Sequence, residues 1–350
     1  QFSNCLSYNN GAFGFHHVGC IDGVTHYKDQ AFNNGALTPA HGFSSHAMRT
    51  TVSDTNWSRY SGTIYFREQA NATIYRVVDH SEKLDMVYNP GAYASLSVGE
   101  WDQNGSRIYV NIGKDISKEI HSIDFITTEC KNIKYYYCTA HHNRSQPGGY
   151  VEGHGFSFDD YTSDSLAYGC VSFENAGHGF MANMTAGTGF FYCTSYKNNG
   201  QGINFSRYSQ NIQAWNNTLY NNKHSGIQLF GPTVNVSIQN NIIYKNSEYG
   251  IDVDANEKVF SILNNYNCLN GNVLGPQHNM DAKPQNIEVN PLMISPEQNN
   301  FHLKPNSPCI DSGTNVGLSE DGEGKAVPKG KSVDMGAYEF LTLKAPGALS

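Results

Sequence analysis

A repeat of 23 or 24 residues in the middle of the chain constrains the fold more than any other feature. Five consecutive segments each carry Gly at the second position, an apolar residue at the third and an Asn near the end: HGFSFDDYTSDSLAYGCVSFENAG, HGFMANMTAGTGFFYCTSYKNNG, QGINFSRYSQNIQAWNNTLYNNKH, SGIQLFGPTVNVSIQNNIIYKNSE and YGIDVDANEKVFSILNNYNCLNGN. None has the 3.6-residue apolar spacing of a helix. The pattern predicts a coil of short parallel strands, one turn per repeat, with about 4.8 Å between turns.

The repeats align residue by residue, so each column of the alignment predicts one stack of side chains along the coil. Asn side chains are suited to satisfying buried backbone groups at corners. Two columns consist of Asn: Asn175, Asn198, Asn222, Asn246 and Asn270 in one, and Asn216, Asn240 and Asn264 in the other. A third column contains cysteines, for which the spacing allows stacked free thiols or disulfides: Cys5, Cys138, Cys170 and Cys193.

The same pattern continues outside these five segments and is interrupted once. NCLSYNNG and HGFSSHAMRTTVSD fit it before the interruption, and YYYCTAHHN fits it afterwards. The stretch between them contains TIYFREQANATIYRVVD and GEWDQNGSRIYVNIG, which are typical of hairpins. We therefore predict an all-β chain with N-terminal coil turns at 1–53, a β-hairpin-rich insertion at 54–121, the main coil turns at 122–272 and a C-terminal cap at 273–350.

Composition narrows the class of function. The net charge is -8 and 15% of the residues are charged, which argues against a nucleic-acid partner because such proteins carry a clustered basic face. No stretch approaches the roughly 18 apolar residues of a membrane-spanning helix. The chain opens within the repeat pattern, at QFSNCLSYNNG, which suggests a natural N-terminus further upstream. Polarity and repeat type favour a secreted or cell-surface protein, and the oligomeric state stays open.

With these repeats the chain resembles the right-handed parallel β-helix proteins of the pectin-lyase-like superfamily. The tail VNPLMISPEQNNFHLKPNSPCIDSGTN, followed by VDMGAYEF, is similar to the C-terminal segment of many secreted bacterial members. The resemblance covers most of the chain and implies a β-solenoid that acts on an extracellular polysaccharide. Because this superfamily includes lyases, hydrolases, epimerases, phage tailspikes and non-catalytic proteins, the resemblance does not choose an activity.

Alternation along each strand predicts which residues face outward, on the face that usually forms the sugar-binding groove in this superfamily. The predicted outward pairs are Ser157 and Asp159, Met181 and Asn183, Asn204 and Ser206, Gln228 and Phe230, and Asp252 and Asp254. A uronate lyase needs a base for the C5 proton and a cation or hydrogen-bond donor for the carboxylate. The candidates for these catalytic roles are His46, Arg49, Asp159, Asp160 and Arg207. The candidate substrate-binding residues are His154, His178, Asn183, Asn204 and Tyr208.

Each candidate also has a structural interpretation. His154 and His178 recur before the Gly of their repeats and could simply hydrogen-bond the turn. The carboxylates of FDDYTSD are suited to turn formation, to a calcium ion, which is the one candidate cofactor, or to glycoside hydrolysis by a pair of Asp residues. Family nine pectate lyases carry a Lys after the Gly-Phe pair and Asp just before it. This chain has other residues at both places, so that calcium-dependent mechanism is not supported.

Three functions therefore remain open. The preferred one is a lyase that cleaves a uronate-containing polysaccharide by β-elimination. The alternatives are a glycoside hydrolase that uses paired Asp residues and a non-catalytic carbohydrate-binding or adhesion β-helix. Long excursions tend to wall a functional groove, and both the insertion and the HNRSQPGGYVEG loop border the turns with His46, Arg49 and Asp159. We expect the site there, reaching Arg207, and not near Asp252.

Overall fold

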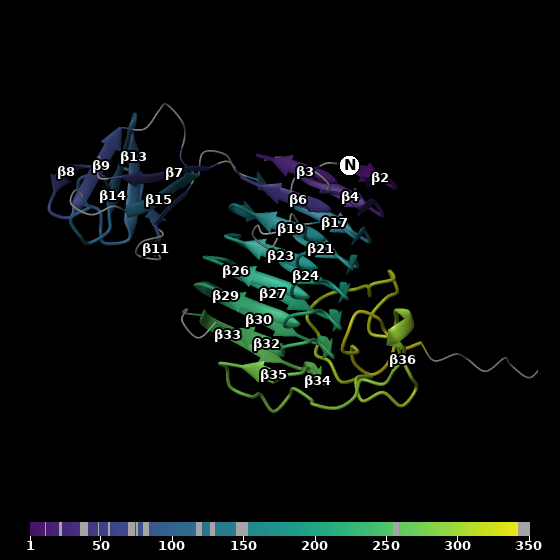
Figure 1. Ribbon diagram of the computed structural model, residues 1–350. Helices are drawn as coiled ribbons and strands as arrows, with labels where there is room; N and C mark the ends of the chain where they lie inside the picture. The colour runs from purple at the N-terminus through teal and green to yellow at the C-terminus, as the bar shows by residue number, and fades with distance from the viewer. Residues whose placement is uncertain are drawn as a thin grey trace, which may run out of the picture.

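The computed structural model is a right-handed parallel β-helix (Figure 1), which confirms the coil of parallel strands predicted from the repeat and the handedness implied by the resemblance. It describes residues 1–341 with the exception of 11, 21–22, 36–40, 48, 55–56, 69–73, 75, 80–83, 117–120, 127–129, 145–152 and 255–258. Within this part of the chain, no helix is long and apolar enough to cross a membrane.

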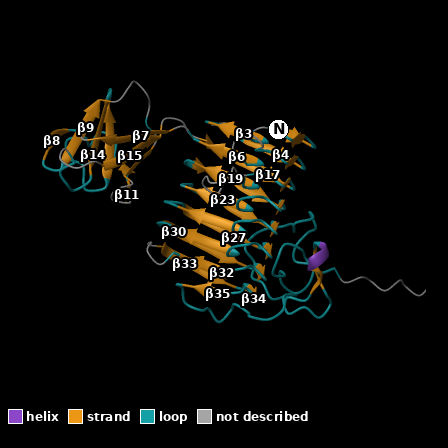
Figure 2. Cartoon of the chain, viewed as in Figure 1, coloured by secondary structure: helices purple, strands orange, loops and turns teal. Residues whose placement is uncertain are grey.

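Three parallel sheets of eight strands form the walls of the coil (Figure 2). The first wall contains β1 (Phe2–Ser3), β4 (Val24–Tyr27), β17 (Ile133–Tyr136), β21 (Leu166–Tyr168), β24 (Gly189–Phe191), β27 (Gln210–Trp215), β30 (Thr233–Gln239) and β33 (Val259–Asn265). The second contains β2 (Leu6–Tyr8), β5 (Gln30–Phe32), β18 (Thr139–His141), β22 (Val171–Phe173), β25 (Thr194–Tyr196), β28 (Thr218–Tyr220), β31 (Ile242–Tyr244) and β34 (Cys268–Asn270). The third contains β3 (Phe15–Val18), β6 (Phe43–His46), β19 (Phe156–Asp159), β23 (Phe180–Asn183), β26 (Ile203–Ser206), β29 (Ile227–Phe230), β32 (Tyr249–Val253) and β35 (Gly275–His278).

The Gly-apolar pair of each repeat explains how the turns stack. The apolar residue points inward, and equal residues lie on one another: the rings of Phe156 and Phe180 are 5.0 Å apart and nearly parallel. The preceding Gly sits where the next turn approaches closely. A Cβ on Gly179 would lie 2.7 Å from the carbonyl oxygen of Gly202, so a side chain has no room there.

One predicted Asn column forms a continuous ladder at a corner of the coil. Each amide bonds the next in the order Asn34, Asn143, Asn175, Asn198, Asn222, Asn246 and Asn272. The prediction that Asn270 is the last member of this column was wrong, because Asn272 takes that place. The partner of Asn246 lies 26 residues further on because the final turn is two residues longer than the repeat.

The same two extra residues also shift the alignment of the other predicted Asn column. Asn216 and Asn240 are hydrogen-bonded neighbours, as predicted. Asn264, however, pairs in register with Ile238 instead of Asn240. The cysteines of the predicted column are free thiols, and so are the other cysteines of the chain.

Two further sheets interrupt the coil between β6 and β16 (Cys130–Lys131), and Figure 1 shows them beside the N-terminal turns. One consists of β7 (Arg49–Asp54), β10 (Arg76–Asp79), β11 (Leu84–Asp85) and β15 (His121–Ile126). The other consists of β8 (Ser58–Ser61), β9 (Ile64–Glu68), β12 (Val87–Tyr88), β13 (Glu100–Asn104) and β14 (Arg107–Asn111). Because β7 and β15 pair over their full lengths, these sheets extend from residue 49 to residue 126. They have an apolar core of their own around Trp57, Trp101 and Ile108.

The chain after β35 lies against the second wall. It contains β36 (Met293–Ser295), a 3₁₀ turn η1 (Pro296–Gln298) and β37 (Asn300–Leu303). Elsewhere, in the coil, β16 forms a two-stranded sheet with β20 (Thr162–Ser163). Phe301 packs against Tyr196 and Tyr220, two rings of the outer aromatic column of that wall. The C-terminal segment therefore covers the second wall and leaves the outer face of the third wall open.

Candidate functional site

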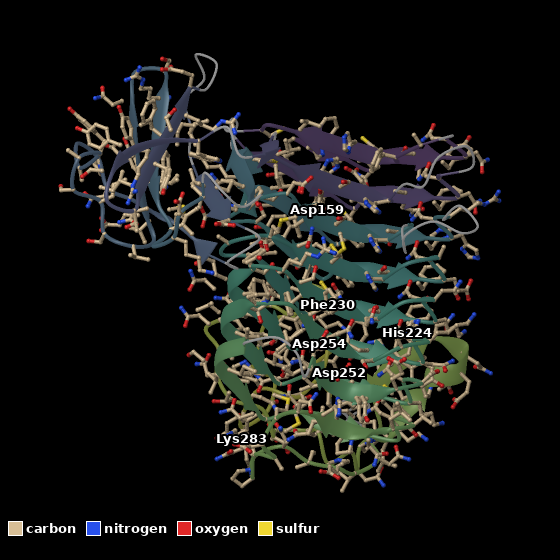
Figure 3. All side chains as sticks on the ribbon, turned by 60° about the vertical axis from the view of Figure 1, so that its left-hand side comes forward. Asp159, His224, Phe230, Asp252, Asp254 and Lys283 are labelled. Carbon is tan, nitrogen blue, oxygen red and sulfur yellow. The ribbon has the colours of Figure 1, made fainter. Side chains whose placement is uncertain are left out.

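A cleft of about 740 Å³ lies on the outer face of the third wall, over β19, β23, β26 and β29. Figure 3 shows this face, with Asp159 toward the N-terminal turns, Phe230 further along the coil and His224 to one side. The residues that line the cleft are His154, Asp159, His178, Met181, Asn183, Gly200, Gln201, Asn204, Ser206, Arg207, His224, Gln228 and Phe230. Strand alternation and the repeat register together place them on one face.

Stacked histidines form one rim of the cleft. The rings of His41 and His154 are 4.6 Å apart, and so are the rings of His154 and His178. Each Nδ1 accepts a hydrogen bond from a backbone N–H one turn later: His154 Nδ1 from His178, at 2.9 Å, and His178 Nδ1 from Gln201, at 3.1 Å. The recurring His is therefore a structural acceptor that also faces the cleft.

This arrangement keeps the two imidazoles neutral. Burial lowers the pKa of His154 well below its usual value, and the neighbouring His178 and His41 lower it further. Burial, with a contribution from His224, lowers the pKa of His178 from 6.5 to about 3. Because Nδ1 accepts a backbone bond in both residues, Nε2 carries the proton and is a donor. These residues can bind an oxygen atom of a ligand, but they are poor proton acceptors.

The histidine stack predicts a loss of stability in acid. A His whose pKa is lowered by folding stabilises the protein fully above its unfolded pKa of 6.5, and this contribution is lost as the pH falls toward about 3. The free energy of unfolding should fall by ~1.4 kcal/mol per pH unit in that interval for each such His. Urea titrations at several pH values measure this fall. His178→Phe keeps a ring in the stack but cannot be protonated, so its decline should be shallower; an equally steep decline would contradict the prediction.

The opposite rim carries Asp159 and Arg207. Asp159 Oδ1 accepts bonds from Asn183 Nδ2, at 2.6 Å, and from the backbone N–H of Asp160, at 2.7 Å. Asn183 in turn accepts a bond from the hydroxyl of Ser206, at 2.9 Å. These three side chains occupy equivalent positions on successive strands, so a carboxylate begins a hydrogen-bonded row along the rim.

Arg207 follows directly on this row. It lies in the left-handed region of backbone conformation, at φ 35°, and its side chain is exposed. Its N–H donates to the carbonyl of Phe230, at 2.7 Å, which fixes the turn. Among the described residues that line the cleft, Arg207 is the only Lys or Arg and Asp159 is the only carboxylate.

The other predicted site residues lie elsewhere. His46 is the register partner of Asp159 on β6, while Arg49 begins β7 and pairs with Ile126 in the inserted sheet; the side chains of both lie outside the described residues. Asp160 has φ 41° and its carbonyl accepts the N–H of Ala47, so it shapes the turn. Tyr208, at φ 55°, packs partly buried against the core of the coil.

Several residues that line the cleft were not among the site residues predicted from the sequence. Gln228 and Phe230 stand at predicted outward positions, and alternation alone could have included them. Gln201 takes the position of the histidines in the next repeat. His224 lies just before the corner of its repeat. The sequence feature that could have identified it is Glu248, 24 residues later, whose Oε1 lies 2.9 Å from His224 Nδ1.

The described residues provide no evident metal centre. No group of three or more His, Cys, Asp or Glu side chains within the described part of the chain could hold a metal ion. The Oδ1 atom of Asp159 accepts hydrogen bonds from the Asn183 amide and from the backbone N–H of Asp160. The candidate calcium ion therefore stays an expectation from the sequence.

The comparison with known proteins identifies the fold. Residues 125–267 match the family model described as a right handed beta helix region. This match agrees with the right-handed parallel β-helix fold of the chain. No curated protein matches the sequence.

Solved structures with this fold are similar at low sequence identity. The A-module of the mannuronan C-5 epimerase AlgE4 from Azotobacter vinelandii is 14% identical, with a TM-score of 0.46, and the match covers 82% of this chain and 57% of that one. The periplasmic alginate epimerase AlgG is 13% identical, with a TM-score of 0.45 and coverages of 81% and 49%. The pectate lyase Pel9A is 15% identical, with a TM-score of 0.35 and coverages of 61% and 70%. The chain thus spans about half the length of the first two, and the likeness concerns the fold.

Proposed function

We propose that the cleft binds a uronate-containing polysaccharide outside the cell and cleaves it by β-elimination. The observation that carries this proposal is the charge pattern of the cleft: one guanidinium and one carboxylate share a rim, and no other Lys, Arg, Asp or Glu is among the described residues that line it. A polymer with one carboxylate on each sugar needs a cation near the reacting ring, and Arg207 supplies it.

The geometry suggests a division of roles. The strands that carry Asp159 and Arg207 are two turns apart, roughly 10 Å, so both side chains can reach one sugar ring between them. Arg207 binds the C6 carboxylate and stabilises the charge that develops when the C5 proton leaves. Asp159 accepts that proton, a double bond forms between C4 and C5, and the C4–O4 bond breaks; O4 leaves with the bonding electrons and takes a proton from water to become a hydroxyl. His46, the register partner of Asp159, is the alternative acceptor.

The same pattern disfavours glycoside hydrolysis. Hydrolysis uses two carboxylates on opposite sides of the scissile bond. Asp160, the partner proposed from the sequence, shapes a turn next to Asp159 and is not among the described residues that line the cleft. His154 and His178 do not replace it, because their imidazoles are held neutral.

The test is incubation with a panel of polyuronates, with calcium and with a chelator. We expect absorbance in the ultraviolet band of unsaturated uronates to rise and to depend on both Asp159 and Arg207. Release of reducing sugar without that absorbance would favour the hydrolase. Exchange of the C5 hydrogen with deuterated solvent, without chain cleavage, would indicate epimerisation in the same cleft. Binding without any product would identify a carbohydrate-binding or adhesion module.

A further inference from the structure

A chain of hydrogen bonds runs along the floor of the cleft and continues beyond it. Gln228 Oε1 accepts bonds from Gln201 Nε2, at 2.6 Å, and from Asn204 Nδ2, at 3.1 Å. Gln228 Nε2 donates to Asp252 Oδ2, at 3.4 Å, and Asp252 Oδ1 lies 2.9 Å from His278 Nδ1. Asp252 is partly buried on β32, one turn past the strands beneath the cleft.

The carboxylate sets the direction of this chain. A carboxylate only accepts hydrogen bonds, so Gln228 must turn its amide nitrogen toward Asp252 and its oxygen toward the cleft. That oxygen then takes one amide hydrogen from Gln201 and one from Asn204, which orients both amides and leaves their side-chain oxygens as acceptors. Gln201 is 7% exposed, and its Oε1 is buried without a partner among the described residues.

The row on the opposite rim has the same consequence. Asp159 accepts from Asn183, Asn183 accepts from Ser206, and the hydroxyl proton of Ser206 is thereby used. What Ser206 can still offer a ligand is an oxygen lone pair. The two rows start from carboxylates at opposite ends of the cleft, and both leave acceptors on the same middle turn, next to Arg207.

We propose that this middle turn is a subsite for the hydroxyl groups of a sugar ring. Gln201, Asn204 and Ser206 accept hydrogen bonds from the ring, and Asp252 is a positioning residue outside the cleft that keeps the amides in the accepting orientation. The inference rests on the proposed function, because it specifies how the sugar is oriented in the cleft. Its hydroxyl groups face the floor, and its carboxylate lies at Arg207. A sugar whose hydroxyls are acetylated has no proton to donate and should be rejected.

Calorimetry with oligogalacturonate and with its 2,3-di-O-acetylated form tests this subsite. Wild type should prefer the free hydroxyls by about tenfold or more, because acetylation leaves buried acceptors unpaired. Asp252→Ala frees Gln228 to turn over, so this preference should fall to about twofold or less. Asp252→Asn still offers an oxygen to Gln228 and should keep the preference, as should Asp254→Ala, the matched loss of a charge two residues away. Equal preference in wild type and Asp252→Ala, or an equal loss in all three variants, would overturn the proposal.

A neutral galacto-oligosaccharide separates this inference from the proposed function. If it binds, and the binding weakens in Asp252→Ala while oligogalacturonate is not bound at all, the hydroxyl subsite stands and the preference for a uronate fails. If wild type binds none of the three sugars, both fail. Should Asp252→Ala melt well below wild type, Gln201→Leu, which removes one acceptor directly, is expected to show the same loss of preference; an unchanged preference there would also overturn the proposal.

Discussion

Arg207→Gln is expected to lower kcat/KM on the polyuronate that the protein cleaves by about 100-fold or more, the usual effect of removing one group that stabilises developing charge. Arg207 is the only Lys or Arg among the described cleft-lining residues, so no second lining Lys or Arg can take over the carboxylate. Stability should hardly change. The side chain is exposed, and the left-handed backbone at φ 35° is equally strained with Gln.

The matched control is Lys223→Gln. Lys223 is exposed near the end of the same repeat and is not among the residues that line the cleft, so its substitution removes the same charge outside the lining. It should retain kcat/KM within about twofold, because exposed charges are screened by salt. Arg207→Lys keeps the charge but not the planar fork, so an intermediate loss is expected. Full activity in Arg207→Gln, or an equal loss in Lys223→Gln, would place the reacting carboxylate elsewhere.

The periodicity of the sequence carried much of this geometry. Alternation within a strand and the constant repeat length determine which side chains share a face, so Asp159, Asn183 and Asn204 could be assigned to one surface before any coordinates, and Arg207 could be placed on or beside it. The histidines could be placed at a corner for the same reason. Whether that surface performs the proposed chemistry is a question for the experiments above.

Other features could not be read from the repeat, because they depend on local departures from it. The two extra residues of the last turn moved the ladder from Asn270 to Asn272. Arg207 and Tyr208 both have a left-handed backbone conformation, and the ring of Tyr208 packs against the core. Arg49 belongs to a strand with a distant antiparallel partner, since Arg49 pairs with Ile126, and no local pattern reveals such a pairing. The direction of the amide chains depends on Asp252, which contributes nothing to the cleft lining itself.

The Asn ladder leads to the largest stability effect that we expect. Asn222 is fully buried in the middle of the ladder. Its Oδ1 accepts the backbone N–H and the side-chain amide of Asn198, at 3.1 and 3.0 Å. Its Nδ2 donates to Asn246 Oδ1, at 3.0 Å, and to the carbonyl of Ser195, at 3.1 Å. One side chain thus satisfies groups on both neighbouring turns, and the residues that carry these groups are fully buried.

Asn222→Ala should therefore lower the free energy of unfolding by about 3–5 kcal/mol, since each buried polar group left without a partner costs about 1–3 kcal/mol. Urea unfolding followed by circular dichroism measures this loss. Lys223→Ala, one residue further on and exposed, should stay within about 0.5 kcal/mol of wild type. Asn198→Ala removes bonds that it shares with Asn222, so the double variant should lose less than the sum of the two single losses. A loss below about 1 kcal/mol in Asn222→Ala would mean that water replaces the missing bonds and that the ladder contributes little to holding successive turns together.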